Sequence, residues 1–153
     1  MKLTTKGRYA VTALLDLALH DSEGPVCLSE IAGRQDISLP YLEQLFTRLR
    51  RGGLVASTRG PGGGYNLGKP AAQIPVADII RAVDEPIDST QCGGRENCHD
   101  NHRCMTHELW EELNATVYGF LSGVKLSHLV DKQRTRTVAV VRGKSRNPES
   151  VSA

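Results

Sequence analysis

Residues 59–64 read RGPGGG, and this stretch restricts the fold more than any other part of the sequence. Four glycines and one proline in six residues exclude a regular helix there and indicate a tight turn. The run LVAST (54–58) precedes the turn and YNL (65–67) follows it, and both are typical of short strands. The stretch is therefore predicted to be the glycine-rich tip of a β-hairpin.

Three helical segments precede this hairpin. The first covers 8–20, with an apolar face formed by Val11, Leu14, Leu15 and Ala18, and DSEGP (21–25) ends it. A short helix is expected over 28–35, with Leu28, Ile31 and Ala32 facing inward. Ile37 is expected to be buried in the tight turn that follows.

The third helix is expected over 39–51. Ser38 is a suitable N-cap, and Pro40 falls in the first turn, where a missing backbone N–H costs nothing. Its buried positions are predicted to be Leu42, Leu45, Phe46 and Leu49, and Gly52-Gly53 ends it. The order of helix, short helix, tight turn, helix and hairpin predicts a winged helix-turn-helix, a mainly α fold with a small β wing.

The remainder of the chain divides into two parts. After a linker at 70–75 and a short helix at 76–83, residues 71–133 hold a polar loop (about 84–107) and a long helix (about 106–124) that Thr106 is expected to cap. The long helix has an apolar stripe: Leu109, Trp110, Leu113, Val117, Phe120, Leu121 and Val124. Such a stripe predicts pairing with the same helix of a second subunit. We expect residues 134–153 to form a disordered basic tail.

The charge is unevenly distributed: residues 1–70 have a net charge of +3, residues 71–133 of −5 and residues 134–153 of +4. A basic N-terminal domain favours a polyanion partner, although a solvated surface would give the same count. The chain shows neither a secretory signal core nor an apolar run long enough to cross a membrane. We expect a cytoplasmic protein whose cysteines stay reduced.

A helix-turn-helix places the start of its second helix in the major groove of DNA. Ser38, Tyr41, Glu43 and Gln44 lie there; Gln44 can pair with adenine, and Glu43 can accept from a cytosine amino group. Arg59 suits a narrow minor groove, and glycines such as Gly60 let the wing approach DNA closely. The alternative is a small helical domain with a polar surface.

The segment 91–107, QCGGRENCHDNHRCMTH, contains the pattern C-x5-C-x5-C-x2-H, formed by Cys92, Cys98, Cys104 and His107. Zinc accepts three cysteines and one histidine, but structural zinc ligands usually come in closer pairs. An iron–sulfur cluster also accepts histidine on one iron and tolerates wider spacing. A segment without a metal, or a set of redox thiols, is the third reading. His102 competes with His107, whereas His99, adjacent to Cys98, is expected to be exposed.

The remaining cysteine and histidines are assigned simpler roles. Cys27 is expected to be a buried or incidental thiol, His20 a helix-end residue and His128 a surface residue.

The segments MKLTTKGRYAVTALLDLA, ISLPYLEQLFTRLRRGGLV and RGPGGGYNLG, together with the cysteine pattern, closely resemble the iron–sulfur cluster regulators (the IscR branch) of the Rrf-type family of bacterial winged-helix transcription factors. The resemblance covers about residues 1–130. It implies a homodimer with one [2Fe-2S] cluster per subunit, held by Cys92, Cys98, Cys104 and His107. It also implies that the loaded protein represses genes for cluster assembly, with the assembly machinery as the source of the cluster.

The same resemblance assigns DNA contacts to Tyr41, Gln44 and Arg59, and implies that Glu43 excludes the cluster-free form from one class of operator. At Pro40 the sequence departs from the family pattern, where a small hydroxyl residue is expected, which leaves the operator preference open. A nitric-oxide-sensing branch of the family has similar cysteines and an acidic ligand from its first helix; here that position is Arg8, and His107 is present. A small electron-transfer iron–sulfur protein is the alternative from another class. No nucleophile–base set suggests an enzyme.

Overall fold

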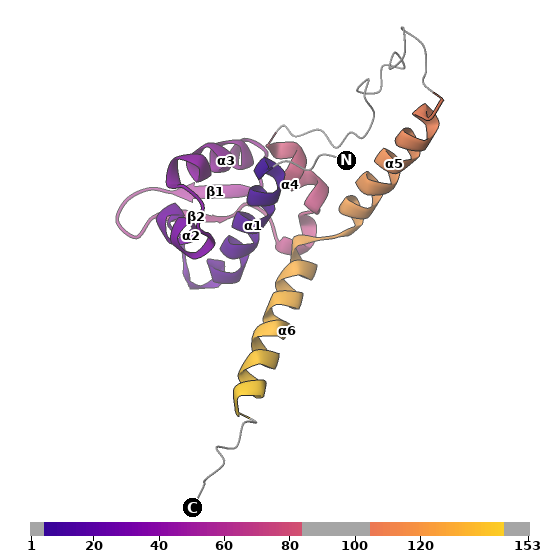
Figure 1. Ribbon diagram of the computed structural model, residues 1–153. Helices are drawn as coiled ribbons and strands as arrows, with labels where there is room; N and C mark the ends of the chain where they lie inside the picture. Colours follow the sequence, from indigo (N-terminus) through magenta and orange to yellow (C-terminus); the bar gives the residue numbers. More distant parts are fainter. Residues whose placement is uncertain (1–4, 84–104, 146–153) are drawn as a thin grey trace, which may run out of the picture.

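The computed structural model describes the backbone of residues 5–83 and 105–145, and the side chains of residues 5–83 and 105–137. Three helices come first, followed by a two-stranded sheet and three further helices (Figure 1). Their bounds are α1 Thr5–His20, η1 Asp21–Glu23, α2 Leu28–Gln35, α3 Leu39–Arg51, β1 Val55–Thr58, β2 Gly64–Leu67, η2 Ala71–Gln73, α4 Val76–Ala82, α5 His107–Gly123 and α6 Leu126–Ser145. The predicted winged helix-turn-helix is confirmed.

Helices α1, α2 and α3 share the main core with the wing. The four predicted core positions of α3 are buried, as is Ile37 in the turn before it: Leu42, Leu45, Phe46 and Leu49. The predicted face of α1 was partly wrong, because Ala10, Ala13, Leu14 and Leu17 are buried, whereas Val11, Leu15 and Ala18 are only partly buried. Helix α1 contacts α2, α3, α4 and α6, so its buried surface extends beyond one stripe and uses small residues where helices come close.

The wing is an antiparallel pair whose register runs from Val55 opposite Leu67 to Thr58 opposite Gly64. Val26 extends the sheet: its N–H donates to the Tyr65 carbonyl (2.9 Å) and its carbonyl accepts from the Tyr65 N–H (2.8 Å). The Tyr65 ring meets Phe46 of α3 edge-on, with centroids 5.0 Å apart. These contacts fix the wing to α3 and to the segment before α2.

Two glycines at the wing tip are required by its geometry. Gly62 has a positive φ of +73°, which favours glycine, and a Cβ on Gly63 would lie 2.3 Å from the Thr58 carbonyl oxygen. A tight return between the two strands therefore excludes side chains at these positions.

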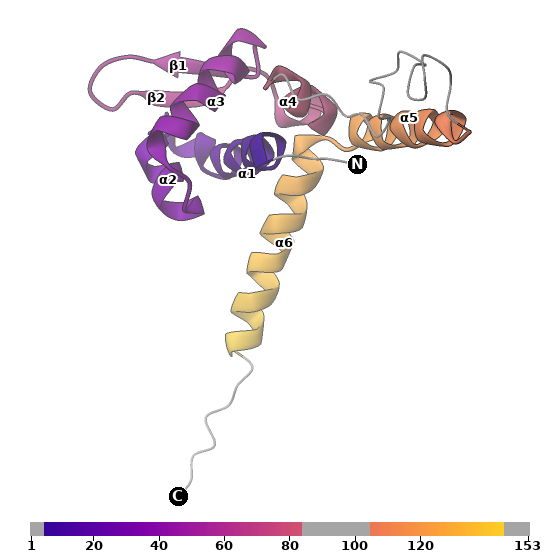
Figure 2. The same ribbon diagram turned by 45° about the horizontal axis from the view of Figure 1, so that its top comes forward.

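Helices α5 and α6 extend away from the N-terminal body in both views (Figures 1 and 2). Their junction is attached to that body by two backbone hydrogen bonds, from Leu126 N to Ile74 O (2.8 Å) and from Val76 N to Val124 O (2.9 Å). Leu126 and Val130 are buried. The end of α5 and the start of α6 are therefore held against η2 and α4.

Three details differ from the sequence-based expectation. Helix α6 includes residues 134–145, which were expected to be disordered; residues 146–153 lie outside the described part. The helix continues because its first turns are anchored in the core and each further residue adds one backbone hydrogen bond. Ser38 and Thr106 occupy N-cap positions without a side-chain capping bond, and the Thr106 hydroxyl accepts from the Trp110 indole N–H instead (3.0 Å).

Among the described helices, none has the length and apolarity of a membrane span.

Candidate functional site: the recognition helix, the wing and His107

The exposed face of α3 carries the predicted base-reading residues. Glu43 and Gln44 are exposed, and Ser38 and Pro40 are exposed at the start of the same helix. The buried side chains on the opposite face of α3 fix the direction of this surface. The side chain of Thr47 bonds to the Glu43 carbonyl oxygen (2.8 Å), which leaves the Glu43 carboxylate outside this local contact.

Tyr41 is only half-buried, because its ring packs against α1. The rings of Tyr41 and Tyr9 meet edge-on, with centroids 5.8 Å apart and an interplanar angle of 82°. This contact holds the Tyr41 ring against α1 at the edge of the exposed α3 surface.

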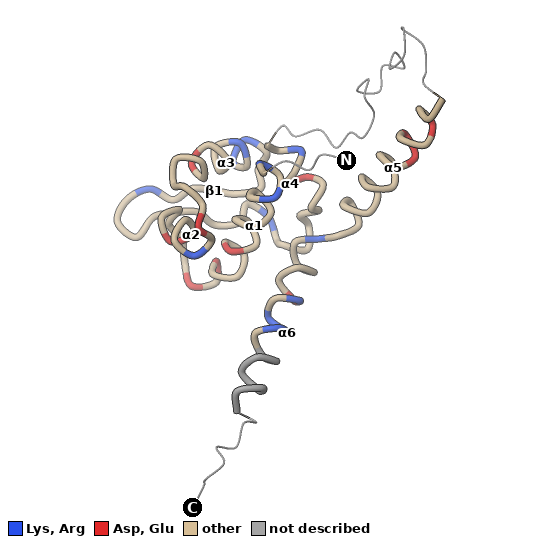
Figure 3. The backbone as a smooth tube through the Cα atoms, viewed as in Figure 1, with Lys and Arg blue, Asp and Glu red and all other residues tan. Residues whose placement is uncertain are grey.

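The wing places Arg59 and Gly60 at its exposed tip, and Gly60 has φ +99°. Lys and Arg positions occur on the wing loop and along α3, as Figure 3 shows. Arg50 and Arg51 in the last turn of α3 are exposed as well. A helix with exposed side chains that can contact base edges, next to a wing that carries an arginine, is an arrangement that can bind duplex DNA.

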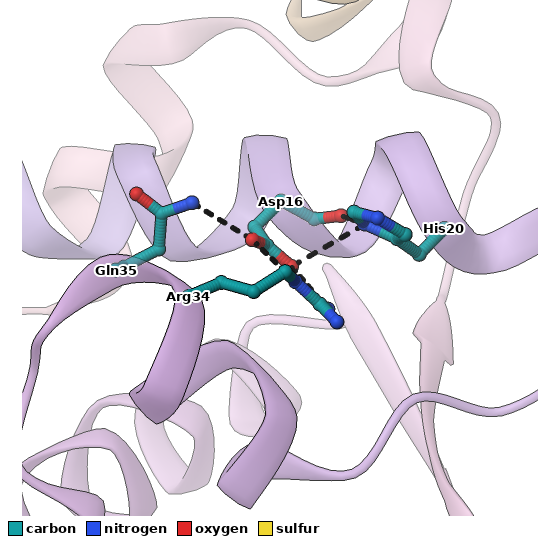
Figure 4. Close-up of polar contacts among 4 residues, drawn as sticks. All are labelled: Asp16, His20, Arg34 and Gln35. Carbon is teal, nitrogen blue, oxygen red and sulfur yellow. Dashed lines mark hydrogen bonds and ion pairs between the residues drawn. The ribbon is translucent and has the colours of Figure 1, made fainter.

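A buried carboxylate holds α1 and α2 together behind this surface (Figure 4). Asp16 is 3% exposed and accepts from Arg34 Nη2 (2.7 Å to Oδ1), from Arg34 Nε (3.0 Å to Oδ2) and from Gln35 Nε2 (2.8 Å to Oδ2). His20 Nδ1 lies 3.5 Å from Asp16 Oδ1. Sequence reasoning missed this cluster, although an acid inside the apolar run of α1 was a usable signal.

Burial alone would raise the pKa of Asp16, but the hydrogen bonds from Arg34 and Gln35 and the charge of Arg34 outweigh burial and lower it. The same hydrogen bond to Asp16 raises the pKa of Arg34. The carboxylate is therefore charged at neutral pH and fixes α2, which leads directly into the turn before α3.

Of the four predicted cluster ligands, only His107 lies in the described part of the chain. Cys92, Cys98 and Cys104, and the rival residues His99 and His102, fall within 84–104, outside the described residues. His107 is the first residue of α5 and is 1% exposed, and its Nε2 lies 3.0 Å from Glu111 Oε1. A carboxylate beside one ring nitrogen is common for histidines that bind metals, since it fixes the ring and its tautomer.

The other cysteine and histidines have clear positions. Cys27 was expected to be a buried or an incidental thiol; it is exposed, so the buried alternative was wrong. It precedes α2, and its Sγ lies 3.4 Å from the Gly63 carbonyl oxygen. His20 ends α1 and His128 is exposed, as expected.

Comparisons with known proteins agree on one family. The Rrf2 family, described as an iron-dependent transcriptional regulator, matches residues 3–132. The chain is 60% identical over 139 residues to the HTH-type transcriptional regulator IscR of Photorhabdus laumondii, which covers 91% of this chain and 85% of the relative. For the protein of the same name in Serratia proteamaculans the identity is 58%, with the same coverage.

Solved structures give the same result. T. potens IscR has a TM-score of 0.72 at 38% identity and covers 87% of this chain and 88% of that one. CymR, the global cysteine regulator of B. subtilis, has a TM-score of 0.74 at 36% identity, with 86% of this chain and 98% of that one covered. These relatives are regulators, so the electron-transfer alternative is not supported and the expectation of a non-enzymatic protein is confirmed. The chain belongs to the Rrf2 family of iron-dependent transcriptional regulators, and within it this is an IscR-like DNA-binding regulator.

Proposed function

We propose that the protein is a cytoplasmic homodimer that senses iron–sulfur cluster supply and represses cluster-assembly genes when it is loaded. Cys92, Cys98, Cys104 and His107 would hold one [2Fe-2S] cluster per subunit, delivered by the cluster-assembly machinery. When bound, the cluster supplies a redox-labile centre that joins three thiolates and an imidazole. Loss of that centre would release the segment and lift repression.

The observation that carries this proposal is the buried position of His107. An imidazole that is 1% exposed, at the first residue of a helix and three positions after Cys104, is held in one place rather than moving with solvent. Glu111 adds a carboxylate 3.0 Å from Nε2. A fixed nitrogen donor close to a cysteine in sequence fits the Cys₃His ligand set of a cluster.

The DNA contacts in this proposal are assigned to residues of α3 and the wing whose side chains are exposed or half-buried. Gln44 and Glu43 would read base edges in the major groove, with Tyr41 beside them and Ser38 and Pro40 close to the backbone. Arg59 and Gly60 would bring the wing to the minor groove. Pairing of α5 between two subunits would set the spacing of the two recognition helices.

The visible spectrum and metal content of anaerobically purified protein test the cluster assignment. We expect iron–sulfur absorption and two iron atoms for every subunit in the wild type, as [2Fe-2S] requires. Alanine at any of the four ligand positions should remove both. Colourless protein containing zinc would contradict the proposal, and a full, equally stable cluster in His107→Ala would reject that ligand and favour His102.

A further inference from the structure

Helix α4 lies between the recognition helix and α5 in both views of the fold (Figures 1 and 2). Its buried residues include Ile79 and Ile80, and Val83 directly after it is also buried. In sequence, residues 84–104, which contain three cysteines and are called the cysteine segment below, lie between the end of α4 at Ala82 and the start of α5 at His107. The segment is therefore joined covalently to the described body through these two helices.

Arg48, in the last turn of α3, bonds to the end of α4. Its Nη1 donates to the Val83 carbonyl oxygen at 3.0 Å, from a partly buried position. Carbonyls at the end of a helix lack intrahelical donors, and a cation is favourable there. The two helices are also closely packed at this point, since a Cβ on Gly52 would lie 3.3 Å from the Ala82 Cβ.

Helix α4 is also attached to α5, through Arg81. Its guanidinium donates to the Tyr118 hydroxyl, and Cζ lies 5.3 Å from the centroid of the Tyr118 ring. The end of α4 is thus bonded to two helices: Arg48 of α3 donates to the Val83 carbonyl, and Arg81 of α4 donates to Tyr118 of α5.

We propose that Arg48 and Val83 form the contact by which the state of the cysteine segment reaches the recognition helix, an inference that rests on the proposed cluster-sensing function. The Val83 carbonyl belongs to the same rigid peptide plane as the nitrogen of residue 84. A change in the chain direction after α4 that rotates this peptide plane also rotates the acceptor of Arg48. Arg48 is a positioning residue in this scheme: it tilts the C-terminal end of α3 and so the exposed face that carries Glu43 and Gln44.

A double-mutant cycle tests this coupling. Operator affinity is measured for wild type, Cys92→Ala, Arg48→Met and the double variant, on an operator that the wild type binds better when loaded. Methionine keeps the apolar stem of Arg48 and removes its donors. We expect the affinity ratio between loaded and cluster-free protein to fall by about tenfold in the Arg48→Met background, the scale of a lost charge-assisted hydrogen bond. The visible spectrum of Arg48→Met should match that of the wild type.

Arg51→Met is the matched control, because Arg51 is an exposed arginine in the same turn. A phosphate contact would weaken the loaded and cluster-free forms by the same factor, and that result for Arg48→Met would overturn the relay. An unchanged ratio in Arg48→Met would overturn it as well. If Cys92→Ala leaves wild-type affinity unaltered, both the relay and the cluster-sensing function fail.

Tyr118→Phe provides a second test that leaves packing intact, since Tyr118 is 42% exposed and keeps its ring. Loss of the hydroxyl acceptor should reduce the same affinity ratio by about threefold, as expected for an ordinary hydrogen bond. An unchanged ratio would remove α5 from the relay.

Discussion

Asp16 shows how a single charged residue can set the position of the DNA-reading surface. Its carboxylate is 3% exposed, whereas the Arg34 side chain that pairs with it is 36% exposed. A buried charge must be matched by donors, and here all of the strong ones come from α2. The pair therefore fixes the angle between α1 and α2, and through the short turn at Ile37 it influences α3.

The unequal burial of this pair predicts unequal effects of removing each partner. Arg34→Ala should lower the free energy of unfolding by about 3 kcal/mol, because it leaves a buried carboxylate with weaker donors. Asp16→Ala should cost only about 1–2 kcal/mol, because the remaining arginine can be hydrated. Urea unfolding of both variants measures the order, and an equal or reversed order would contradict this account.

The lowered pKa of Asp16 also gives a pH dependence. Because the folded-state pKa lies below the unfolded one, the stabilisation is complete above about pH 4 and is lost as the pH falls through the folded-state value. Asp16→Asn should therefore flatten the acid side of the stability profile. Glu23→Gln, an exposed acid in η1, should leave that side as in the wild type.

Glu43 is the residue whose replacement should change operator choice. Its exposed carboxylate is repelled by phosphates unless a base amino group meets it. The test uses an operator that the wild type binds only when loaded. Cluster-free Glu43→Ala should bind this operator about tenfold more tightly than the cluster-free wild type does. Titration of both cluster-free proteins measures this. Glu30→Ala, an exposed acid on α2, is the control; equal discrimination by Glu43→Ala and wild type would make Glu43 a simple surface acid.

At the scale of elements, the wing combines strands that are paired with each other and with Val26 and the exposed side chain of Arg59, for which the described residues show no hydrogen bond or ion pair. Arg59 lies at the exposed tip beyond the paired strands, so its replacement should leave the fold intact. Arg59→Ala should weaken operator binding by about 1–3 kcal/mol, and Arg59→Lys by less, because lysine keeps the charge. Salt-dependent binding curves compare the three proteins, and unchanged affinity in Arg59→Ala would mean that the wing stays off the DNA.

Elements defined by local chemistry were predictable from sequence, and contacts between elements were not. The bounds of α3 and its four buried residues follow from periodicity and from the glycines after Arg51, and the hairpin follows from RGPGGG. The bonds from Arg34 to Asp16 and from Arg48 to Val83 join residues 18 and 35 positions apart, and no periodic signal marks such pairs. The buried side of α1 was also misplaced, because its partners α4 and α6 come from distant parts of the chain.

At the scale of the molecule, α5 has an apolar face that stays partly or largely exposed. None of its seven predicted stripe residues is fully buried; Leu109 is 55% exposed and Phe120 is 69% exposed. Tyr118, which contacts α4 through Arg81, lies on another side of the helix. A long apolar face whose side chains stay partly or largely exposed favours a second copy of α5 as its partner, which would place two recognition helices on one operator.

Two aspartates on this face should separate the subunits without unfolding them. Leu109→Asp with Phe120→Asp replaces exposed side chains, so the thermal stability of the N-terminal domain should change little, while sedimentation should show a monomer. Operator affinity should fall by about a hundredfold or more, because two linked half-site contacts become one. Ala115→Asp with Gly119→Asp adds the same charge at exposed positions away from the stripe, where a Cβ on Gly119 meets nothing within 4 Å. This control should remain a dimer, and a dimer in both variants would place the interface on another surface.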